Sequence, residues 1–278
     1  EEEEPTNTVV EVVKSKSMNE DDLNGVWEDV KEKNFYTVIP LVGELIEAHP
    51  NTDEESRSSQ SRDGERIQAF LQKMENINSY ELDQLVVEFN NLNLNNKATK
   101  NRIMKFFVET ASIDSLKYYT RFLKINEMNL SDLIEELINY LDKGFRSQLY
   151  QNKLNFKNIL FFVEMIKFKM IPTHIIFHKI RKLTLNITST NNIDILSVFY
   201  EHVGRFLLND PDYKDLMREM IEMLRETLKR PNLKINDKLA INNLLLIVEP
   251  PTTKVKSLQT KPELSPKLQF IQRLIRVE

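Results

Sequence analysis

The sequence predicts an all-α fold in which antiparallel helix pairs stack side by side. Glycine is scarce, at 5 of 278 residues, although β-sandwiches and α/β enzymes of this length use it in tight turns and phosphate loops. After residue 65, apolar side chains recur at spacings of three and four, the period of one helical face. The expected helix starts also recur at a nearly constant interval. A series of amphipathic helices joined by short turns is therefore indicated.

The N-terminal part of the chain is expected to be irregular before the first helices. Residues 1–19 are polar and charged, which is typical of a linker. A short helix is expected to start at Asp21 and Asp22 and to carry Trp27. A second segment is expected over residues 35–48, with a kink or break at Pro40, because proline removes a helical hydrogen bond.

A single domain is expected from residue 20 to residue 249. Within it, residues 50–64 hold no aliphatic or aromatic side chain. Such a stretch buries too little surface to offset its chain entropy, which predicts a disordered acidic and serine-rich surface loop. Residues 250–278 are expected to form a C-terminal linker followed by a short amphipathic helix from Lys267 to Val277.

The helical pattern is clearest over residues 130–150. The apolar stripe expected to be buried there contains Leu133, Ile134, Leu137, Ile138, Leu141, Phe145 and Leu149. Residues 154–170 are apolar nearly all round, which indicates a helix covered on more than one side. Pro172 is expected to end that helix and Thr173 to start the next, so a turn of about two residues forces antiparallel neighbours. A further helix is expected to start at Asp210-Pro211 and to end at Pro231.

Alternate helices are expected to start at a regular interval. The expected starts are Ser112, Leu154, Asn192 and Asn236. Helix pairs that recur every 40 to 47 residues or so are the mark of the HEAT and armadillo class. One pair cannot bury its apolar face alone, so the pairs are expected to stack into a right-handed superhelix with a concave side. The predicted fold is therefore a HEAT-like superhelical stack.

Residues that could carry chemistry are few. The chain has no cysteine, which excludes disulfides, thiolate zinc sites and a cysteine nucleophile. His174 and His178 share one helical face, but Ile175 stands where a metalloprotease helix has its glutamate. Glu135 and Glu136 are adjacent on a polar face, so nothing separates their pKa values for acid–base work. No catalytic, cofactor-binding or metal-binding residue is predicted, and we expect the chain not to be an enzyme.

The charge of the chain is unevenly distributed. Residues 1–96 hold 8 Lys and Arg against 22 Asp and Glu, whereas residues 97–182 hold 16 against 8. The basic residues at the expected interhelix corners are Lys143, Arg146, Lys153, Lys157, Lys167, Lys169, Lys179, Arg181 and Lys182. On one interpretation they form a ridge that binds RNA phosphates without sequence preference. On the other they are solvated cations whose stems cover an apolar core.

Targeting signals are not visible in the sequence. No apolar run approaches the roughly 20 residues that a bilayer span needs, so no membrane partner is expected. The chain opens with Glu1 to Glu4 and Pro5 rather than with the basic start of a signal peptide. This opening is typical of a fragment taken from an acidic linker.

A resemblance to a known family covers most of residues 26–276. It is carried by NNKATKNRIMKFFVET (95–110) and INYLDKGFRSQLYQNKLNFKNILFFVEMIKFKMIPTHIIFHKIRKL (138–183). These segments resemble the fungal up-frameshift-two family, the scaffold proteins of nonsense-mediated mRNA decay. The match is to the second of three domains of the type found in the middle of translation-initiation factor four-gamma. VWEDVKEKNFYTVIPLV (26–42) is similar to the opening helix of that domain.

The resemblance implies a cytoplasmic scaffold that bridges an RNA helicase, up-frameshift-one, and an RNA-associated adaptor, up-frameshift-three. In the family both partners dock on parts of the parent protein outside this chain, so no binding residue is carried over. The second middle domain would then be mainly an architectural spacer between partner-binding domains. Direct RNA binding through the basic ridge remains the alternative.

Overall fold

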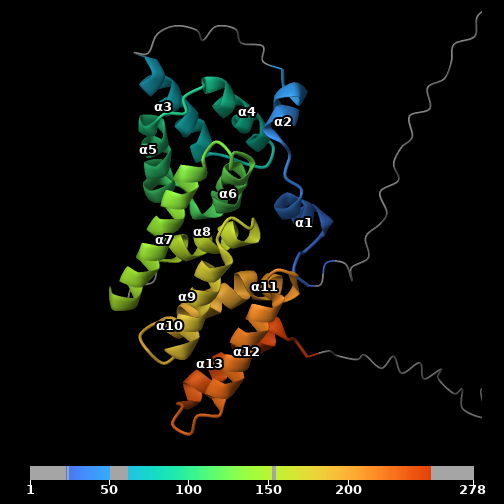
Figure 1. The fold of residues 1–278 in the computed structure, drawn as a ribbon, viewed down its shortest axis with the longest axis vertical. Coiled ribbons are helices and arrows are strands. Elements are labelled where there is room, and N and C mark those ends of the chain that lie inside the picture. Colours follow the sequence, from blue (N-terminus) through green and yellow to red (C-terminus); the bar gives the residue numbers. More distant parts are fainter. Residues whose placement is uncertain (1–22, 24, 51–61, 152–154, 252–278) are drawn as a thin grey trace, which may run out of the picture. The chain divides into compact units, whose positions relative to one another are not determined.

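The computed structural model describes residues 23, 25–50, 62–151 and 155–251, with the backbone alone for residues 145–151 (Figure 1). The expected linker over residues 1–19 and the expected helix from Lys267 lie outside the described residues. So does most of the expected loop over residues 50–64. All described helices belong to one unit that ends at Val248. Every helix in the described ranges is too short or too polar to cross a membrane.

The described residues form helices and no strand. The α-helices are α1 (Val30–Thr37), α2 (Val42–Ala48), α3 (Asp63–Glu75), α4 (Leu82–Leu92), α5 (Lys97–Lys105), α6 (Leu116–Ile125), α7 (Ser131–Gln151), α8 (Phe156–Lys167), α9 (Thr173–Leu185), α10 (Asn192–Phe199), α11 (Arg205–Asn209), α12 (Lys214–Leu228) and α13 (Ile235–Val248). Two π-helical turns, η3 (Phe106–Thr110) and η5 (Tyr200–Gly204), extend α5 and α10, and a 3₁₀ turn, η4 (Ile113–Ser115), precedes α6.

The helices pack in two layers. Consecutive helices form pairs, namely α3 with α4, α7 with α8, α9 with α10, and α12 with α13. In one layer α3 packs on α5, α5 on α7, and α9 on α12. In the other layer the order of neighbours is α2, α4, α6, α8, α10 and α13. Figure 1 shows this succession from α3 and α4 to α12 and α13, and it confirms the stack of helix pairs.

The helix starts agree with the interval expected from the sequence. The helices of the second layer begin at Leu116, Phe156, Asn192 and Ile235, close to each expected start. The buried stripe of α7 is also confirmed at Leu133, Ile134, Leu137, Ile138 and Leu141. The side chains of Phe145 and Leu149 lie outside the described residues.

The core is continuous along the stack and rich in aromatic residues. One cluster of buried side chains runs from Tyr36 to Val248. Helix α8 lies at its centre and is buried on several sides, as its apolar composition predicted. Tyr119 links neighbouring pairs, because its buried hydroxyl donates to the carbonyl of Met74 on α3 at 2.8 Å.

The first helix starts later than the sequence suggested. Residues 25–28 form turns and bends, and α1 begins at Val30 because Asp29 caps it by accepting from the Glu32 amide at 2.7 Å. Trp27 is therefore not helical. The break at Pro40 is confirmed, since α1 ends at Thr37 and α2 begins at Val42.

Two other helix boundaries differ from expectation. Asp210 does not start α12, because its carboxylate accepts from the Asp212 amide at 2.9 Å in a local turn, and the helix begins at Lys214. The turn between α8 and α9 takes residues 168–172 rather than about two. Lys169 adopts a left-handed conformation there, with φ of 56°.

Candidate interaction surfaces

The predicted basic ridge is spread over α7, α8 and α9. Lys143 lies on α7, Lys157 near the start of α8, and Lys167 at its end. Lys169 follows α8 in the turn. Lys179, Arg181 and Lys182 lie on α9. Lys153 and the side chain of Arg146 lie outside the described residues.

Two of these lysines are largely withdrawn from solvent. Lys179 on α9 pairs with Asp142 on α7 at 2.5 Å, and its side chain is 10% exposed. Its ammonium group also lies 5.6 Å from the centre of the Phe162 ring. Lys167 pairs with Glu164 at 3.1 Å, and both side chains are nearly buried. The pair of Lys179 joins α9 to α7, whereas Lys167 and Glu164 both lie on α8. Both cations are unavailable to a phosphate at the surface.

Lys169 and Arg181 contact the α12 region. Lys169 reaches Asp210 at 2.9 Å and Asp212 at 3.0 Å. Partial burial lowers the pKa of Lys169, but hydrogen bonds to the two carboxylates outweigh burial and the pKa is raised. Arg181 pairs with Glu219 at 3.0 Å.

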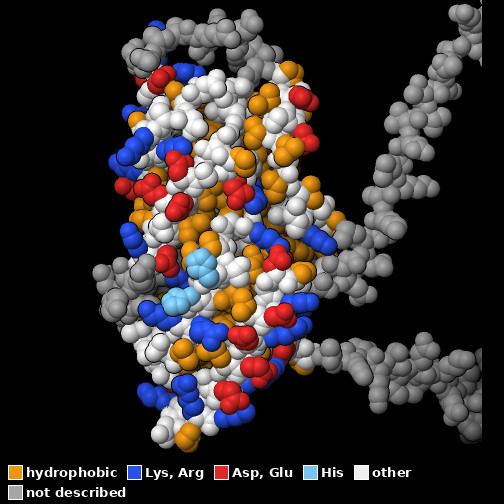
Figure 2. Space-filling view, viewed as in Figure 1, with side chains coloured by type: hydrophobic (Ala, Val, Ile, Leu, Met, Phe, Trp, Pro, Cys, Tyr) orange, Lys and Arg blue, Asp and Glu red, His pale blue; other side chains and the backbone are white. Residues whose placement is uncertain are grey.

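Lys157 has no carboxylate partner among the described residues and donates instead to the carbonyl of Val108 at 3.2 Å. Burial lowers its pKa. Lys143 and Lys182 are the members of the predicted set that are exposed and form no ion pair with another described residue. Figure 2 shows basic and acidic side chains interspersed on the face in view, without one continuous positive band. The ridge therefore remains a prediction that rests on few free cations.

The most extensive contact missed by the sequence interpretation is made by residues 25–38, here called the strap. Trp27 stacks on Tyr36 with ring centres 5.1 Å apart and meets Phe206 of α11 edge-on at 5.8 Å. Phe35 lies 5.8 Å from both Tyr118 of α6 and Phe168 after α8. The strap thus contacts α6, α11 and the residue after α8 through aromatic side chains.

A buried polar group fixes the strap on α8. The hydroxyl of Tyr36 donates to the Glu164 carboxylate at 2.6 Å and accepts from the Lys167 ammonium group at 3.2 Å. Tyr36 is 5% exposed. Burial and the adjacent Glu164 carboxylate raise the pKa of Tyr36, so its hydroxyl stays protonated and remains a donor.

An arginine lies at each end of the strap. Arg121 of α6 donates to the carbonyl groups of Phe35 and of Val38, the latter at 3.1 Å. Gly25 has φ of 64° and lies so close to the Arg205 guanidinium that a Cβ atom would collide with it. Aromatic residues within an otherwise polar stretch were the signal that could have revealed this docking.

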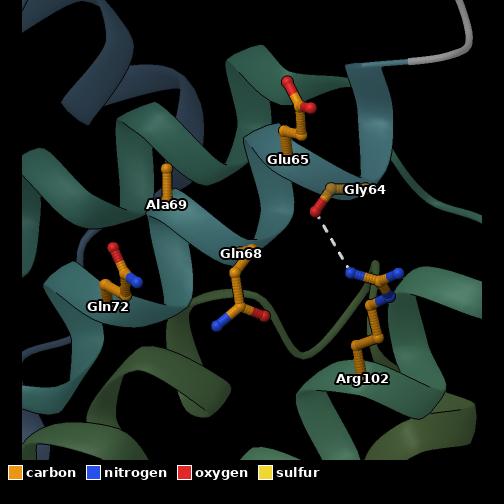
Figure 3. A pocket seen from close by; sticks show the side chains of 6 residues that line it. All are labelled: Gly64, Glu65, Gln68, Ala69, Gln72 and Arg102. Carbon is orange, nitrogen blue, oxygen red and sulfur yellow. Dashed lines mark hydrogen bonds between the residues drawn. The ribbon is translucent and has the colours of Figure 1, made fainter.

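A shallow groove of about 560 Å³ lies between α3 and α5 (Figure 3). Its lining consists of Gly64, Glu65, Gln68, Ala69, Gln72 and Arg102. Arg102 donates to the Gly64 carbonyl at 3.1 Å, and its guanidinium group closes one end of the groove. Its lining holds no nucleophile beside a base.

The two histidines that share one face of α9 lie at its start and one turn further on. His174 and His178 are both exposed. Within the described part of the chain, no three His, Asp or Glu side chains converge as metal ligands.

The fold and these surfaces define a helical-repeat interaction domain. It has a continuous core, and ion pairs and strap contacts connect its helices at the surface. Residues 64–251 match the family of the MIF4G domain. The chain belongs to this family. The strap, residues 25–38, precedes the matched region.

The similar proteins are factors of nonsense-mediated mRNA decay. The chain is 39% identical to Nonsense-mediated mRNA decay protein 2 of Saccharomyces cerevisiae, over 91% of this chain and 23% of that protein. It is 26% identical to the Schizosaccharomyces pombe protein of the same name, over 91% of this chain and 26% of that protein. It is 24% identical to human Regulator of nonsense transcripts 2, over 84% of this chain and 19% of that protein. The chain thus spans about a quarter or less of these relatives, and the resemblance stated from the sequence is confirmed.

Proposed function

We propose that this chain is a scaffold module of the nonsense-mediated mRNA decay machinery. Its main role is that of a stiff spacer between partner-binding parts of a longer protein. Support comes from the MIF4G family and from relatives whose names place them in this decay process. The proposed location is the cytoplasm, where messenger RNA is translated.

The observation that carries the proposal is the continuous core from Tyr36 to Val248. A helix stack whose pairs each pack on their neighbours transmits force along its length and keeps its ends at a fixed separation. The strap adds contacts to α6, α8 and α11 through Phe35, Tyr36 and Trp27. A linker of the same length would let the ends approach each other freely.

The proposed partners are other decay factors and adjacent domains of the same protein. Up-frameshift-one and up-frameshift-three are proposed to act through parts of the parent outside this chain. The module therefore contributes by placing those parts rather than by holding each partner itself. Partners of this kind need no catalytic residue in the module.

Replacement of the module in the full-length protein tests this proposal. In yeast cells lacking their own relative, residues 25–248 are exchanged for a flexible Gly/Ser linker or for an unrelated helical stack of similar length. The level of a reporter transcript with a premature stop codon is then measured. We expect the linker to raise that level several-fold and the unrelated stack to restore decay in large part. Normal decay with the linker would overturn the module's role, and failure of the unrelated stack would overturn the spacer role.

A further inference from the structure

The last helix of the stack exposes an apolar seam. On α13, Ile235 is 75% exposed, Leu239 is 58% exposed and Leu246 is 53% exposed. Asn242 is exposed between them. The steps between these four positions are four, three and four residues, which is the spacing of a coiled-coil seam. The opposite face of α13 is the one that packs on the stack, through Ile241, Leu244 and Val248.

This seam differs in charge from the other exposed helix at the same end. Helix α12 carries ion pairs along its exposed face, between Arg218 and Asp215, Arg225 and Glu222, and Lys229 and Glu226. The seam of α13 has no charged side chain. End helices of a stack ordinarily present a polar outer face to water. An uncharged seam of Ile, Leu and Asn is instead typical of a face that packs on another helix.

The layer order leads to the same conclusion. In the second layer each helix from α2 to α10 packs on the next helix in the order α2, α4, α6, α8, α10 and α13. Among the described residues no helix lies beyond α13 in this order. A helix placed on the seam would continue the layer by one more position.

We propose that the seam of α13 binds an amphipathic helix supplied by a part of the same longer polypeptide that lies outside these 278 residues. This rests on the proposed function, in which the chain is one module of a larger scaffold. The partner helix carries an uncharged apolar seam with the same spacing. It places an amide side chain opposite Asn242, because a polar side chain enclosed in such a seam needs a hydrogen-bond partner and thereby fixes the register.

The size of the seam is the reason for choosing a tethered helix over a second copy. Three apolar side chains and one amide on two heptads bury far less than the roughly 1,200 Å² of a stable complex between separate proteins. A helix tethered by a short flexible linker faces an effective concentration in the millimolar range, so a small seam is sufficient for it. The yeast relative supplies the required length, since this chain covers 23% of it.

Hydrogen–deuterium exchange measured by mass spectrometry tests the proposal. Peptides covering residues 235–248 are compared in the 278-residue chain and in the full-length protein. We expect exchange to be at least 10-fold slower in the full-length protein. The double substitution Leu239→Glu with Leu246→Glu should remove that difference while the 278-residue chain keeps its melting temperature, because both side chains are exposed. Met128→Glu is the matched control, since Met128 is 94% exposed outside α13, and it should leave the difference intact.

Three results would overturn the proposal. One is equal exchange of α13 in the two proteins. Another is a difference that survives the double substitution. The third is protection that grows with the concentration of the isolated chain together with a doubled mass, which would assign the seam to a second copy. The reporter assay with the flexible linker is independent of all three, so the spacer role and the seam can fail separately.

Discussion

At the scale of single residues, buried polar groups divide into those with partners and those without. The hydroxyl groups of Tyr119 and Tyr200 are both buried, in side chains that are 0% and 1% exposed. The Tyr119 hydroxyl donates to the Met74 carbonyl. The Tyr200 hydroxyl has no hydrogen-bond partner among the described residues. A buried hydroxyl without such a partner costs free energy relative to its bonds to water.

The first prediction follows from this contrast. Tyr200→Phe removes an unsatisfied hydroxyl, so we expect the free energy of unfolding to rise by about 1 kcal/mol. For a domain of this size that is a rise in melting temperature of roughly 2–4 °C. Tyr119→Phe is the matched control and should lower stability by about 1 kcal/mol, because it removes a bond that is made. Thermal unfolding followed by circular dichroism checks both, and a lower melting temperature for Tyr200→Phe would contradict the account.

At the scale of helices, the sequence was most informative where burial is periodic. The stripe of α7 and the helix starts of the second layer could be predicted because a packed face must repeat with the helical period. The strap could not be predicted in this way. Tyr36 meets Glu164 across 128 positions and Lys167 across 131, and no local pattern encodes such a contact. Only the aromatic side chains in a polar stretch indicated that something there is buried.

The basic ridge shows the same limit. Clustering of lysines in the sequence does not show which carboxylates they contact. Lys169, for example, pairs with Asp210 and Asp212 from a left-handed turn. The charge pattern was therefore predictable, whereas its pairing was not. That distinction matters because a lysine already paired with a carboxylate neutralises little phosphate charge. It therefore displaces few of the counterions condensed on the RNA.

The second prediction concerns this ridge. Lys143 and Lys182 are exposed and form no ion pair with another described residue. Two phosphate contacts to single-stranded RNA give a slope of about −1.4 in log affinity against log salt. We therefore expect weak binding with a slope no steeper than this, measured by fluorescence anisotropy. Lys143→Glu with Lys182→Glu should abolish the slope, and Arg230→Glu, an exposed residue after α12, is the control. A slope steeper than about −3 would show that the ridge binds RNA through more cations.

At the scale of the whole unit, the strap and the core act together. The strap binds α6, α8 and α11 through Phe35, Tyr36 and Trp27, and Tyr119 and Tyr200 lie inside the same continuous core. The unit should therefore unfold cooperatively, because loss of one contact exposes its neighbours. Because several phenols are buried in one core, cooperative unfolding can be measured as the pH is raised and these phenols ionise.

The third prediction is alkaline unfolding. Burial is the largest cause that raises the pKa of four tyrosines, Tyr36, Tyr119, Tyr200 and Tyr213. The pKa of Tyr119 rises to about 12. A tyrosine whose pKa is higher in the folded than in the unfolded state stabilises the fold fully below pH 10, the usual pKa of a phenol. That contribution is lost as the pH rises from about 10 through the folded pKa. We expect the helical circular dichroism signal to be lost at the same pH at which these phenols ionise. Ionisation of the phenols is measured by absorbance at 295 nm.

A variant assigns part of this effect to the strap. Tyr36→Phe removes one phenol that titrates only on unfolding, so the slope of stability against pH above pH 10 should fall by up to one proton. The variant should also be less stable at pH 7, because Glu164 and Lys167 lose the hydroxyl that connects them. Tyr80→Phe, at a tyrosine that is 91% exposed, should leave both quantities unchanged. Full tyrosine ionisation with the helical signal intact would mean that the phenols reach solvent without unfolding, and that the strap and the core are not one cooperative unit.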